Sequence, residues 1–442
     1  MVMMCQLVYE RGDFMRNRIF SPLKGSLNGE FKVPGDKSIS HRAVMIGSLA
    51  KGQTTITNFL NGEDCLRTIK IFQQFGVDIN INNTDVVINS LGYGKFVEPN
   101  QPLYFGNSGT TARLMLGILA GLPFHTVVYG DKHLTERPMD RVVLPLKKMN
   151  AEINGRNNGL LLPLAIKGKQ LKSIEYNIPV ESAQVKSALI FASLFTQEAS
   201  RFTEKSLTRD HTENMLNAFG ANIKTSDLTI NVVPKPKLIA KHIKVPGDIS
   251  SAAFFLVAGA LVPGSKITLL NVGLNESRTG ILTVLEAMGA NLSTTNIATE
   301  NDEKSGDITV TYKELHGTVI EGDLIPKLID EIPILALLAT QAEGETVIKD
   351  AIEMRVKETD RIKAVYETLT TLGAEIRETE DGLIIKGNSI LTGGSIKGYD
   401  DHRMAMMGII ASLITTEDVI IDNIDSINIS YPSFIDDLNR LI

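Results

Sequence analysis

Residues 286–292 read EAMGANL, and this pattern recurs along the chain. Each copy is a helical stretch that ends at Gly or Asn and then returns to apolar residues. The other copies are QQFGVDI (73–79), LKKMNAEI (146–153), NAFGANI (217–223) and TTLGAEI (370–376). The turn residues of all the copies are Gly76, Asn150, Gly220, Gly289 and Gly373. Gly and Asn tolerate the left-handed backbone that follows the last turn of a helix, so each copy predicts a helix C-terminus.

Apolar segments flank these turns on both sides. The strand-like segments that follow the turns are DVVINS (85–90), LLLPLAI (160–166), LTINVV (228–233), DITVTY (307–312) and GLIIKG (382–387). Small-residue apolar helices, each followed by a strand, occupy residues 43–59, 114–130, 188–205, 252–272, 334–351 and 404–423. Repetition of this kind indicates one folding unit used several times. We therefore predict an α/β fold built from six units.

The sequence VPGD also occurs twice, in FKVPGDKSIS (31–40) and in IKVPGDISSA (243–252). A coincidental Pro-Gly turn is one explanation, because such dipeptides are common in turns between elements. The second copy, however, lies near the middle of the chain, where a division into three and three units falls. We therefore read the two copies as the crossovers between two domains.

The last unit ends without a following strand, whereas residues 17–33 have strand character and no preceding helix. We expect this segment to supply the missing strands. The prediction is a discontinuous domain of residues 1–34 and 247–442 that holds an inserted domain of residues 35–246. A solenoid of stacked units is the alternative, but the helices are too uniformly apolar for it.

The composition indicates a soluble protein of the cytoplasm. The chain has 442 residues, 43% of them apolar and 22% charged, and a formal net charge of −6. It has no apolar run long enough to span a membrane, and its N-terminus carries charges where a signal peptide would be apolar. Cys5 and Cys65 form no disulfide framework, and no Cys/His spacing indicates a zinc site. Residues 1–16 fit no repeat and are expected to be a disordered extension or an upstream start.

The segment VPGDKSISHRAV (33–44) places Lys37, Ser38 and Arg42 at the start of an apolar helix. Free N–H groups at a helix N-terminus, together with two cations and a hydroxyl group, are typical of a phosphate or carboxylate site. A capped helix with solvated charges is the alternative. LYFGNSGTTARLMLG (103–117) is a second such segment, because its glycines let several N–H groups face an anion.

Charged residues recur at other helix starts. In MRVKETDRIKAV, a helix would put Lys357 and Arg361 on one face with Glu358 nearby, although a solvated charged face is the alternative. In LIDEIPIL, Asp330 and Glu331 precede an apolar helix, where a carboxylate complements the helix dipole or serves as a general base. The remaining candidates at helix starts are Arg137, Ser182, Gln184, Arg209, His402 and Arg403. If these starts converge, they form a cation-rich cleft suited to two polyanionic small molecules.

These motifs resemble the 5-enolpyruvylshikimate-3-phosphate (EPSP) synthase family. LYFGNSGTTARLMLG and RVKETDR match its two signatures, and GDKSISHR, ERPMDR, SAQVKSAL and DDHRMAM occur in family order. The resemblance extends from about residue 20 to the C-terminus. It implies a two-domain inverse α/β barrel, with three copies of one folding unit in each domain and the active site in the interdomain cleft.

The resemblance also implies roles for individual residues. Those that would hold shikimate 3-phosphate are Lys37, Ser38, Arg42, Ser182, Ala183, Gln184, Arg209, Asp330 and Lys357. Those that would hold phosphoenolpyruvate are Lys37, Gly109, Arg137, Gln184, Arg361 and Arg403. Asp330 would be the base near the 5-hydroxyl group, and Glu358 and Lys37 would take part in proton transfer. Two departures from the family are Ala183, where many members have Ser, and INISYPSF near the C-terminus, which lacks a lysine that some members carry.

The implied reaction is addition followed by elimination, as in chorismate and aromatic amino acid biosynthesis. The shikimate 5-hydroxyl group attacks C2 of phosphoenolpyruvate, and loss of phosphate from the tetrahedral intermediate leaves the enolpyruvyl ether. The resemblance implies that the partners are the two substrates, that no cofactor is needed and that a monomer suffices. The composition and the mild net acidity separately indicate no metal site, no nucleic-acid surface and no membrane span. The UDP-N-acetylglucosamine enolpyruvyl transferases are the closest rival, but the loop GDKHLTERP lacks their reactive cysteine. A non-enzymatic repeat scaffold would explain the units but not the clustered charges.

Overall fold

Buried apolar side chains form two separate clusters, and each cluster is the core of one part of the chain. The computed structural model describes residues 6–7 and 17–442. Unit 1 contains the described residues up to Pro34 together with Pro246–Ala298 and Lys304–Ile442. Unit 2 contains Gly35–Val245 and Thr299–Glu303. A solenoid with one continuous core is therefore wrong for this chain.

Unit 2 contains three four-stranded sheets and their helices. Its helices are α1 (Lys37–Leu49), α2 (Glu63–Gln74), α3 (Gly109–Gly121), α4 (Asp140–Lys148), α5 (Arg156–Gly159), α6 (Ala183–Ser193) and α7 (His211–Ala218), with 3-10 turns η1 (Tyr93–Lys95) and η2 (Leu134–Glu136). Its strands are β4 (Lys51–Thr57), β5 (Asp78–Asn82), β6 (Asp85–Leu91), β7 (Leu103–Tyr104), β8 (His125–Tyr129), β9 (Glu152–Gly155), β10 (Leu164–Lys167), β11 (Glu175–Asn177), β12 (Ser200–Thr203), β13 (Asn222–Ser226), β14 (Thr229–Val233) and β15 (His242–Lys244).

Unit 1 repeats this organisation with three further sheets. Its helices are α8 (Ile249–Leu261), α9 (Gly280–Ala287), α10 (Ile325–Leu328), α11 (Ile332–Ala339), α12 (Arg361–Thr371), α13 (His402–Ser412) and α14 (Phe434–Asn439), with 3-10 turns η3 (Gly322–Leu324), η4 (Ile352–Val356) and η5 (Asp425–Ile429). Its strands are β1 (Gln6–Leu7), β2 (Arg18–Phe20), β3 (Asn28–Phe31), β16 (Lys266–Gly273), β17 (Asn291–Glu300), β18 (Glu303–Thr311), β19 (Val319–Ile320), β20 (Glu345–Ile348), β21 (Glu375–Glu378), β22 (Leu383–Lys386), β23 (Gly394–Ile396) and β24 (Val419–Ile421).

All six sheets share one topology. The strand that follows the apolar helix pairs in parallel with one edge strand and antiparallel with its other neighbour, as β8 does with β7 and β10. The same arrangement holds for β24, which pairs in parallel with β23 and antiparallel with β2. Every predicted apolar helix and following strand is present. The predicted α/β fold of six repeated units is therefore confirmed.

The helix C-termini also lie where the turn residues predict them. The residue after each C-cap has positive φ: 83° at Gly76, 72° at Asn150, 103° at Gly220, 84° at Gly289 and 93° at Gly373. Side chains with a Cβ rarely adopt this backbone, with Asn the main exception. The left-handed residue ends each helix and turns the chain into the next strand.

The expectation for residues 17–33 is right for one strand and wrong for the other. β2 completes the sheet of the last unit by pairing with β24, and Gln6–Leu7 extends the same sheet as β1. β3 instead pairs in parallel with β16, in the sheet beside α8. In that sheet β3 occupies the edge position parallel to the strand that follows the apolar helix, as β7 does beside β8. Residues 1–5 and 8–16, part of the expected N-terminal extension, lie outside the described residues.

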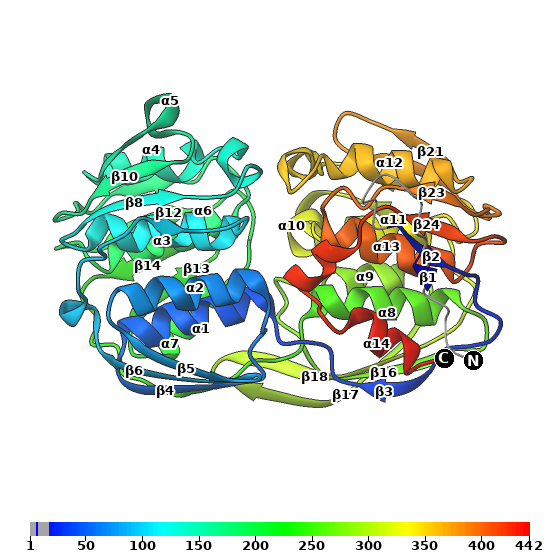
Figure 1. Cartoon of the computed structure of the whole chain (residues 1–442), viewed down its shortest axis with the longest axis horizontal. Helices are drawn as coiled ribbons and strands as arrows, with labels where there is room; N and C mark the ends of the chain where they lie inside the picture. The colour runs from blue at the N-terminus through cyan, green and yellow to red at the C-terminus, as the bar shows by residue number, and fades with distance from the viewer. Residues whose placement is uncertain (1–5, 8–16) are drawn as a thin grey trace. The chain divides into compact units, whose positions relative to one another are not determined.

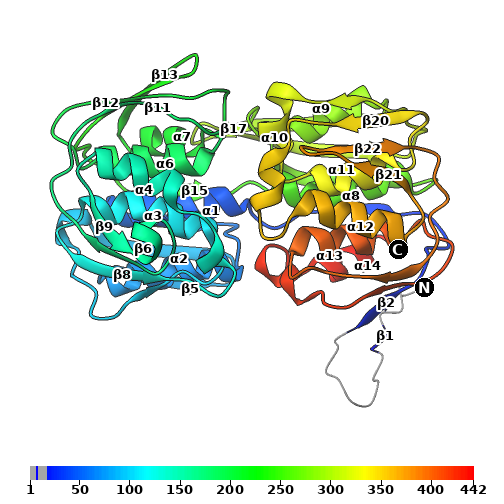
Figure 2. The same ribbon diagram turned by 90° about the horizontal axis from the view of Figure 1, so that it is seen from above.

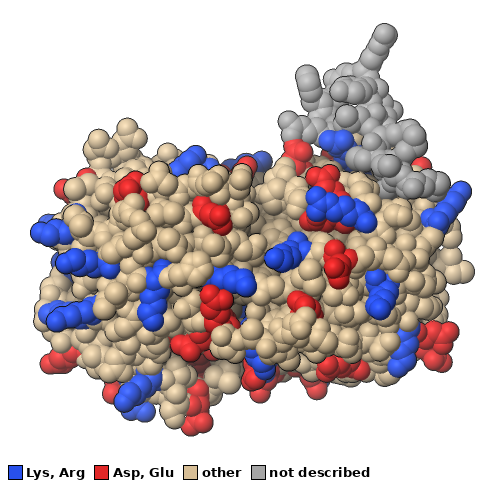
Figure 3. Space-filling model, turned by 90° about the horizontal axis from the view of Figure 1, so that it is seen from below, with Lys and Arg blue, Asp and Glu red and all other residues tan. Residues whose placement is uncertain are grey.

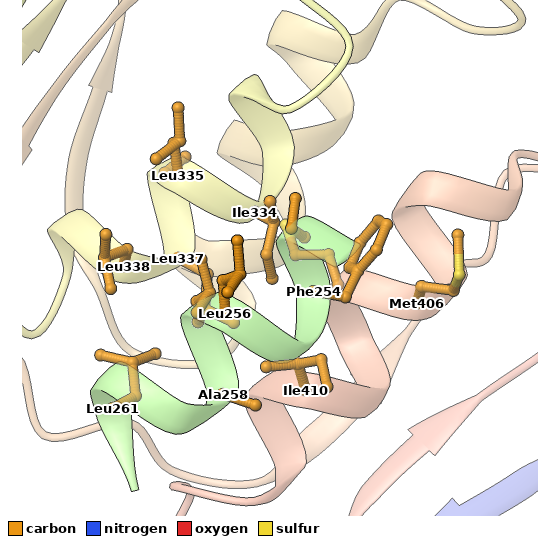
Figure 4. Close-up of a cluster of buried hydrophobic side chains, with 14 of the residues drawn as sticks. Phe254, Leu256, Ala258, Leu261, Ile334, Leu335, Leu337, Leu338, Met406 and Ile410 are labelled. Atoms are coloured by element: carbon orange, nitrogen blue, oxygen red, sulfur yellow. The ribbon is translucent and has the colours of Figure 1, made fainter. Parts of the chain in front are cut away.

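The core helices of unit 1 are buried on almost all sides. In unit 1, α8, α11 and α13 lie side by side (Figure 1), and Figure 2 shows β20, β21 and β22 along the outer side of the same unit. Figure 4 shows that side chains of the three helices meet: Phe254 and Leu256 from α8, Leu337 from α11 and Ile410 from α13. A helix that is apolar all round is stable only in such a core, which explains the sequences AAFFLVAGAL and ILALLA.

The surface carries charges of both signs. Figure 3 shows one face of the molecule, on which Lys and Arg side chains are interspersed with Asp and Glu side chains. Within the described part of the chain, no helix combines the length and the apolar character needed to cross a membrane.

Glycine allows α3 and α6 to pack with their backbones in contact. A Cβ at Gly117 would lie 2.1 Å from the carbonyl oxygen of Ala188, a distance that no side-chain movement relieves. We expect Gly117→Ala to lower the free energy of unfolding by about 2–3 kcal/mol, because the two helices must move apart. Urea unfolding followed by circular dichroism measures this. Gly94→Ala is the control, since nothing lies within 4 Å of its Cβ position; equal midpoints for the two variants would contradict the packing argument.

Candidate functional site

In unit 2, the candidate residues gather at the starts of three core helices. The helices α1, α3 and α6 begin after the N-cap residues Asp36, Ser108 and Ser182. Each N-cap side chain accepts a hydrogen bond from a backbone N–H group, as Asp36 does from Ile39 at 2.8 Å. The N–H groups that remain unpaired within a first turn attract anions.

Two predicted cations lie on α1. The Lys37 ammonium group forms an ion pair with Asp64 on α2. Arg42 is 2% exposed, and its guanidinium group donates to the hydroxyl groups of Thr212 at 2.6 Å and Ser187 at 2.9 Å. Burial lowers the pKa of Arg42 to about 10, so the side chain still carries its charge at neutral pH.

A second group surrounds the start of α3. The Arg113 guanidinium donates to the side-chain oxygen of Gln184 at 2.6 Å, and the Gln184 amide nitrogen donates to Thr110 at 3.0 Å. A Cβ at Gly109 would lie 3.2 Å from Arg113 Nη1 and 3.3 Å from Arg137 Nη1. Glycine therefore leaves the space in which two guanidinium groups approach a helix start, an arrangement suited to a carboxylate or a phosphate.

The last part of the unit 2 set lies at α6 and before α7. Ser182 is the N-cap of α6, and Ala183 is its first residue, so Ala183 presents a backbone N–H group where a serine would add a hydroxyl group. Arg209 lies in the segment between β12 and α7. It is near enough to Arg42 for its charge to lower the pKa of Arg42 further.

In unit 1, the candidate residues gather around Arg361. This side chain is 1% exposed and lies between three carboxylates: Asp401 at 2.8 Å, Glu358 at 2.7 Å and Asp330 at 3.3 Å. Burial acts to lower the pKa of Arg361, but Asp401 and Glu358 outweigh it and raise this pKa. The guanidinium is therefore a permanent positive charge.

Asp330 joins the remaining residues of the unit 1 set. Its carboxylate lies 3.3 Å from the Lys357 ammonium group and 3.3 Å from Arg361. Its backbone carbonyl accepts a hydrogen bond from Arg403 at 2.9 Å, and Arg403 also lies 3.5 Å from Glu331. One aspartate thus lies in the middle of all the cations predicted in this unit.

The helical reading of MRVKETDRIKAV is wrong for its centre. The 3-10 turn η4 ends at Val356, Lys357 is extended, and α12 begins only at Arg361. The reason is Asp360, whose side chain accepts from the backbone N–H of Lys363 at 3.1 Å and caps the helix. Lys357 and Glu358 therefore lie on the segment that leads into the helix start.

Sequence reasoning missed residues that hold the candidates in place. Asp401 is fully buried, forms two hydrogen bonds with Arg361 and caps α13 by accepting from the backbone N–H of Arg403. Ser250 on α8 donates to Glu331 and accepts from Arg278. The position of Asp401, directly before a predicted apolar helix as in both VPGD copies, was an available signal. Nothing in the sequence pattern pointed to Arg278.

No group of three or more His, Cys, Asp or Glu side chains suited to a metal ion occurs among the described residues. The chemistry available from the residues present is that of cations, hydroxyl groups, helix N-termini and carboxylates. Together they can bind anions and move protons.

A buried histidine connects two of the helix starts. His41 Nδ1 lies 2.8 Å from the Thr68 hydroxyl group, Thr68 lies 2.9 Å from Thr111, and Thr111 donates to the N-cap Ser108 at 2.7 Å. Burial, reinforced by the charges of Lys37 and Arg42, lowers the pKa of His41 well below its usual value. His41 is therefore neutral in the folded protein.

This neutral histidine predicts a pH dependence of stability. Below the unfolded-state pKa of ~6.5, His41 binds a proton in the unfolded chain but stays neutral in the folded chain. The contribution of His41 to the unfolding free energy is therefore complete above that pH, and it is lost as the pH falls toward the folded-state pKa. We expect His41→Gln to reduce the slope of the unfolding free energy against pH, below about pH 6.5, by up to ~1.4 kcal/mol per pH unit. Urea titrations at several pH values measure it, with exposed His125→Gln as the control. An unchanged slope in His41→Gln would contradict the assignment.

Comparison with known proteins places the chain in a family. The family model for EPSP synthase (3-phosphoshikimate 1-carboxyvinyltransferase) matches residues 23–438. A 3-phosphoshikimate 1-carboxyvinyltransferase of Oceanobacillus iheyensis is 58% identical over 421 residues, which are 95% of this chain and 98% of the relative. One of Bacillus thuringiensis is 51% identical over 97% of this chain and 100% of the relative.

A solved structure agrees with the sequence relatives. The EPSP synthase of Acinetobacter baumannii superposes with a TM-score of 0.87 at 41% identity, over 96% of this chain and 98% of that one. At this similarity the two chains share one fold over nearly their whole length. The protein described here is therefore a member of the EPSP synthase family.

Proposed function

We propose that this protein transfers the enolpyruvyl group of phosphoenolpyruvate to the 5-hydroxyl group of shikimate 3-phosphate and releases phosphate. The observation that carries the proposal is the gathering of family-motif cations at core-helix starts in both units, within a chain that matches the family over nearly its whole length. Both substrates are small polyanions, and helix starts with arginine and lysine side chains bind such groups.

Shikimate 3-phosphate is the proposed ligand of the unit 2 set. Lys37 and Ser38 begin α1, and Arg42 lies one turn further on the same helix. Ser182, Ala183 and Gln184 supply a hydroxyl group, backbone N–H groups and a side-chain amide at the start of α6. Arg209 is proposed to bind the phosphate group, and Asp330 and Lys357 to contact the ring hydroxyl groups.

Phosphoenolpyruvate is the proposed ligand of arginines from both sets. The start of α3 at Gly109, which the Arg137 guanidinium approaches closely, suits one end of the molecule together with Gln184. Arg361 and Arg403 are proposed to bind the other end, and Lys37 is proposed to contact this substrate as well. Guanidinium groups bind carboxylate and phosphate in a bidentate manner, which fixes the orientation of a planar substrate.

The proposed chemistry uses carboxylates already held by cations. Asp330 takes the proton from the 5-hydroxyl group while the oxygen of that hydroxyl group attacks C2 of phosphoenolpyruvate. C3 gains a proton in the same addition and loses one when phosphate departs, with Glu358 and Lys37 as the proposed proton carriers. General acid–base steps of this kind contribute about 10²–10⁴-fold each to rate.

We also propose that the enzyme works as a monomer in the cytoplasm. A single chain carries both proposed sets of residues, so no second chain is needed to complete them. Light scattering of the eluting protein during size-exclusion chromatography tests the monomer, and a dimer mass would contradict it.

Replacement of the proposed base tests the mechanism. We expect Asp330→Asn to reduce kcat by about 10²–10⁴-fold while shikimate 3-phosphate still binds, because Asn accepts hydrogen bonds but no proton. Asp323→Asn, at an exposed position in η3, is the matched control. Steady-state kinetics and calorimetry measure the two quantities. Near-normal turnover in Asp330→Asn would remove Asp330 from this role.

Phosphate release tests the reaction itself. Purified protein with phosphoenolpyruvate and shikimate 3-phosphate, in the presence of EDTA, is expected to release one phosphate per enolpyruvyl product. A parallel sample contains UDP-N-acetylglucosamine as the acceptor. Phosphate release with the sugar nucleotide instead would favour the rival enolpyruvyl transferase. Absence of phosphate release with both acceptors would contradict the proposed function.

A further inference from the structure

A cluster of buried charges lies one turn beyond the start of α6. Lys186 is 1% exposed, and its ammonium group lies 3.0 Å from Glu204 and 2.9 Å from Glu213. Both carboxylate side chains are only 4% exposed. Burying such charges costs free energy unless they are paired. The cluster also takes no direct part in the proposed chemistry, so its presence calls for another role.

The cluster fixes the position of the chain from the end of β12 to the first turn of α7, which we call the 204–213 segment. Glu204 begins this segment, and Glu213 ends it on α7. In its middle, the Lys186 ammonium group donates to the carbonyl oxygen of Thr208 at 3.1 Å, and the Thr208 hydroxyl group donates to Glu204. One lysine thus holds both ends and the centre of the segment. Thr208 is the residue directly before Arg209.

The same cluster adjoins Arg42. The two hydroxyl groups that accept from Arg42 belong to Ser187, next to Lys186, and Thr212, next to Glu213. Those two hydroxyl groups also lie 2.7 Å from each other. Arg42 also lies near enough to Glu213 and Arg209 for both charges to act on its pKa, so the buried cluster and Arg209 belong to one electrostatic neighbourhood.

We propose that Lys186 is a positioning residue, which holds the 204–213 segment so that Arg209 binds the phosphate group of shikimate 3-phosphate. The inference rests on the proposed function and extends it to a residue that touches no substrate. Without the ammonium group, two buried carboxylates repel each other and Thr208 loses a hydrogen bond. The segment then relaxes, and Arg209 moves with it.

A double-mutant cycle with Arg209 tests the proposal. Calorimetry compares wild type, Lys186→Met, Arg209→Gln and the double variant, with shikimate 3-phosphate and with shikimate, which lacks the phosphate group. We expect each single change to weaken shikimate 3-phosphate binding roughly 10- to 100-fold, the range for hydrogen bonds to charged groups. Shikimate binding should change by less than about twofold, and the double variant should be little weaker than Arg209→Gln alone. If Lys186→Met weakens shikimate 3-phosphate binding by the same factor in the wild-type and in the Arg209→Gln background, the proposal is overturned.

A second variant separates positioning from folding. Lys186→Met/Glu204→Gln/Glu213→Gln carries no charge in the cluster, and we expect it to unfold at a higher temperature than Lys186→Met. Its shikimate 3-phosphate affinity should stay low, because the bond from Lys186 to Thr208 is still missing. Affinity that returns together with stability would show a merely structural role. If Lys186→Met fails to fold, the triple variant replaces it in the cycle.

Two further comparisons complete the experiment. Lys224→Met, at an exposed position on β13, is the matched control for loss of a lysine from unit 2. Wild-type protein that binds no shikimate 3-phosphate would sink the proposed function. Wild-type binding that Lys186→Met leaves unchanged would overturn only the present inference.

Discussion

The unpaired N–H groups at the starts of buried helices are the constraint on which the rest of this structure depends. An α-helix leaves its first four N–H groups without partners inside the helix. Here the core helices start at positions that are themselves shielded, such as Ser108 and Asp401. Most of these starts bring an acceptor into the core as a capping side chain, as α1, α3, α6, α8 and α13 do. The exception is α11, which begins after Glu331 without a side-chain cap. The N–H groups left over then stand beside cations, so a requirement of folding becomes a set of anion sites.

The two units meet this constraint with different charges. In unit 2, α3 and α6 are capped by uncharged serines, so the positive ends of these helices keep their attraction for anions. In unit 1, carboxylates stand at the N-cap positions, and each lies near an arginine: Asp248 near Arg278, Glu331 near Arg403 and Asp401 near Arg361. These pairs offset one another. In unit 2, α1 is capped by the carboxylate of Asp36. The starts of α3 and α6 are therefore electrostatically more open to a polyanion than the start of α1, whereas unit 1 presents arginines whose orientation is fixed by carboxylates.

The parts of the fold that depend on neighbours in sequence could be predicted from the sequence. A glycine such as Gly373 ends a helix by its own backbone preference, and an all-apolar stretch such as AAFFLVAGAL can only be a core helix. The candidate site residues could be found because they lie within a few positions of those helix starts. What could not be predicted depends on pairing across long separations. The partner of β3 is one case, since any free edge strand satisfies its pattern.

The buried partners of the candidates are a second case. Asp401 and Arg361 are 40 residues apart, and the contact between His211 and Glu303 spans 92. A carboxylate in sequence has the same appearance whether it is solvated or paired in the core, and tertiary packing alone decides between them. Lys357 shows the converse error: its spacing from Arg361 fits a helix, but the capping side chain of Asp360 starts the helix later.

The insertion of unit 2 into unit 1 has a consequence for synthesis on the ribosome. Leu27 hydrogen-bonds Ser265, 238 residues further along the chain. At ~5–20 residues per second, that partner emerges roughly 10–50 s after Leu27, long enough for unit 2 to fold first. During this interval β3 has no strand to pair with, and β2 waits still longer for β24. The N-terminal strands are thus short edges that the nascent chain must keep from pairing elsewhere. β3 gains its partner once β16 is made, whereas β2 closes its sheet only after β24, the last strand, is made.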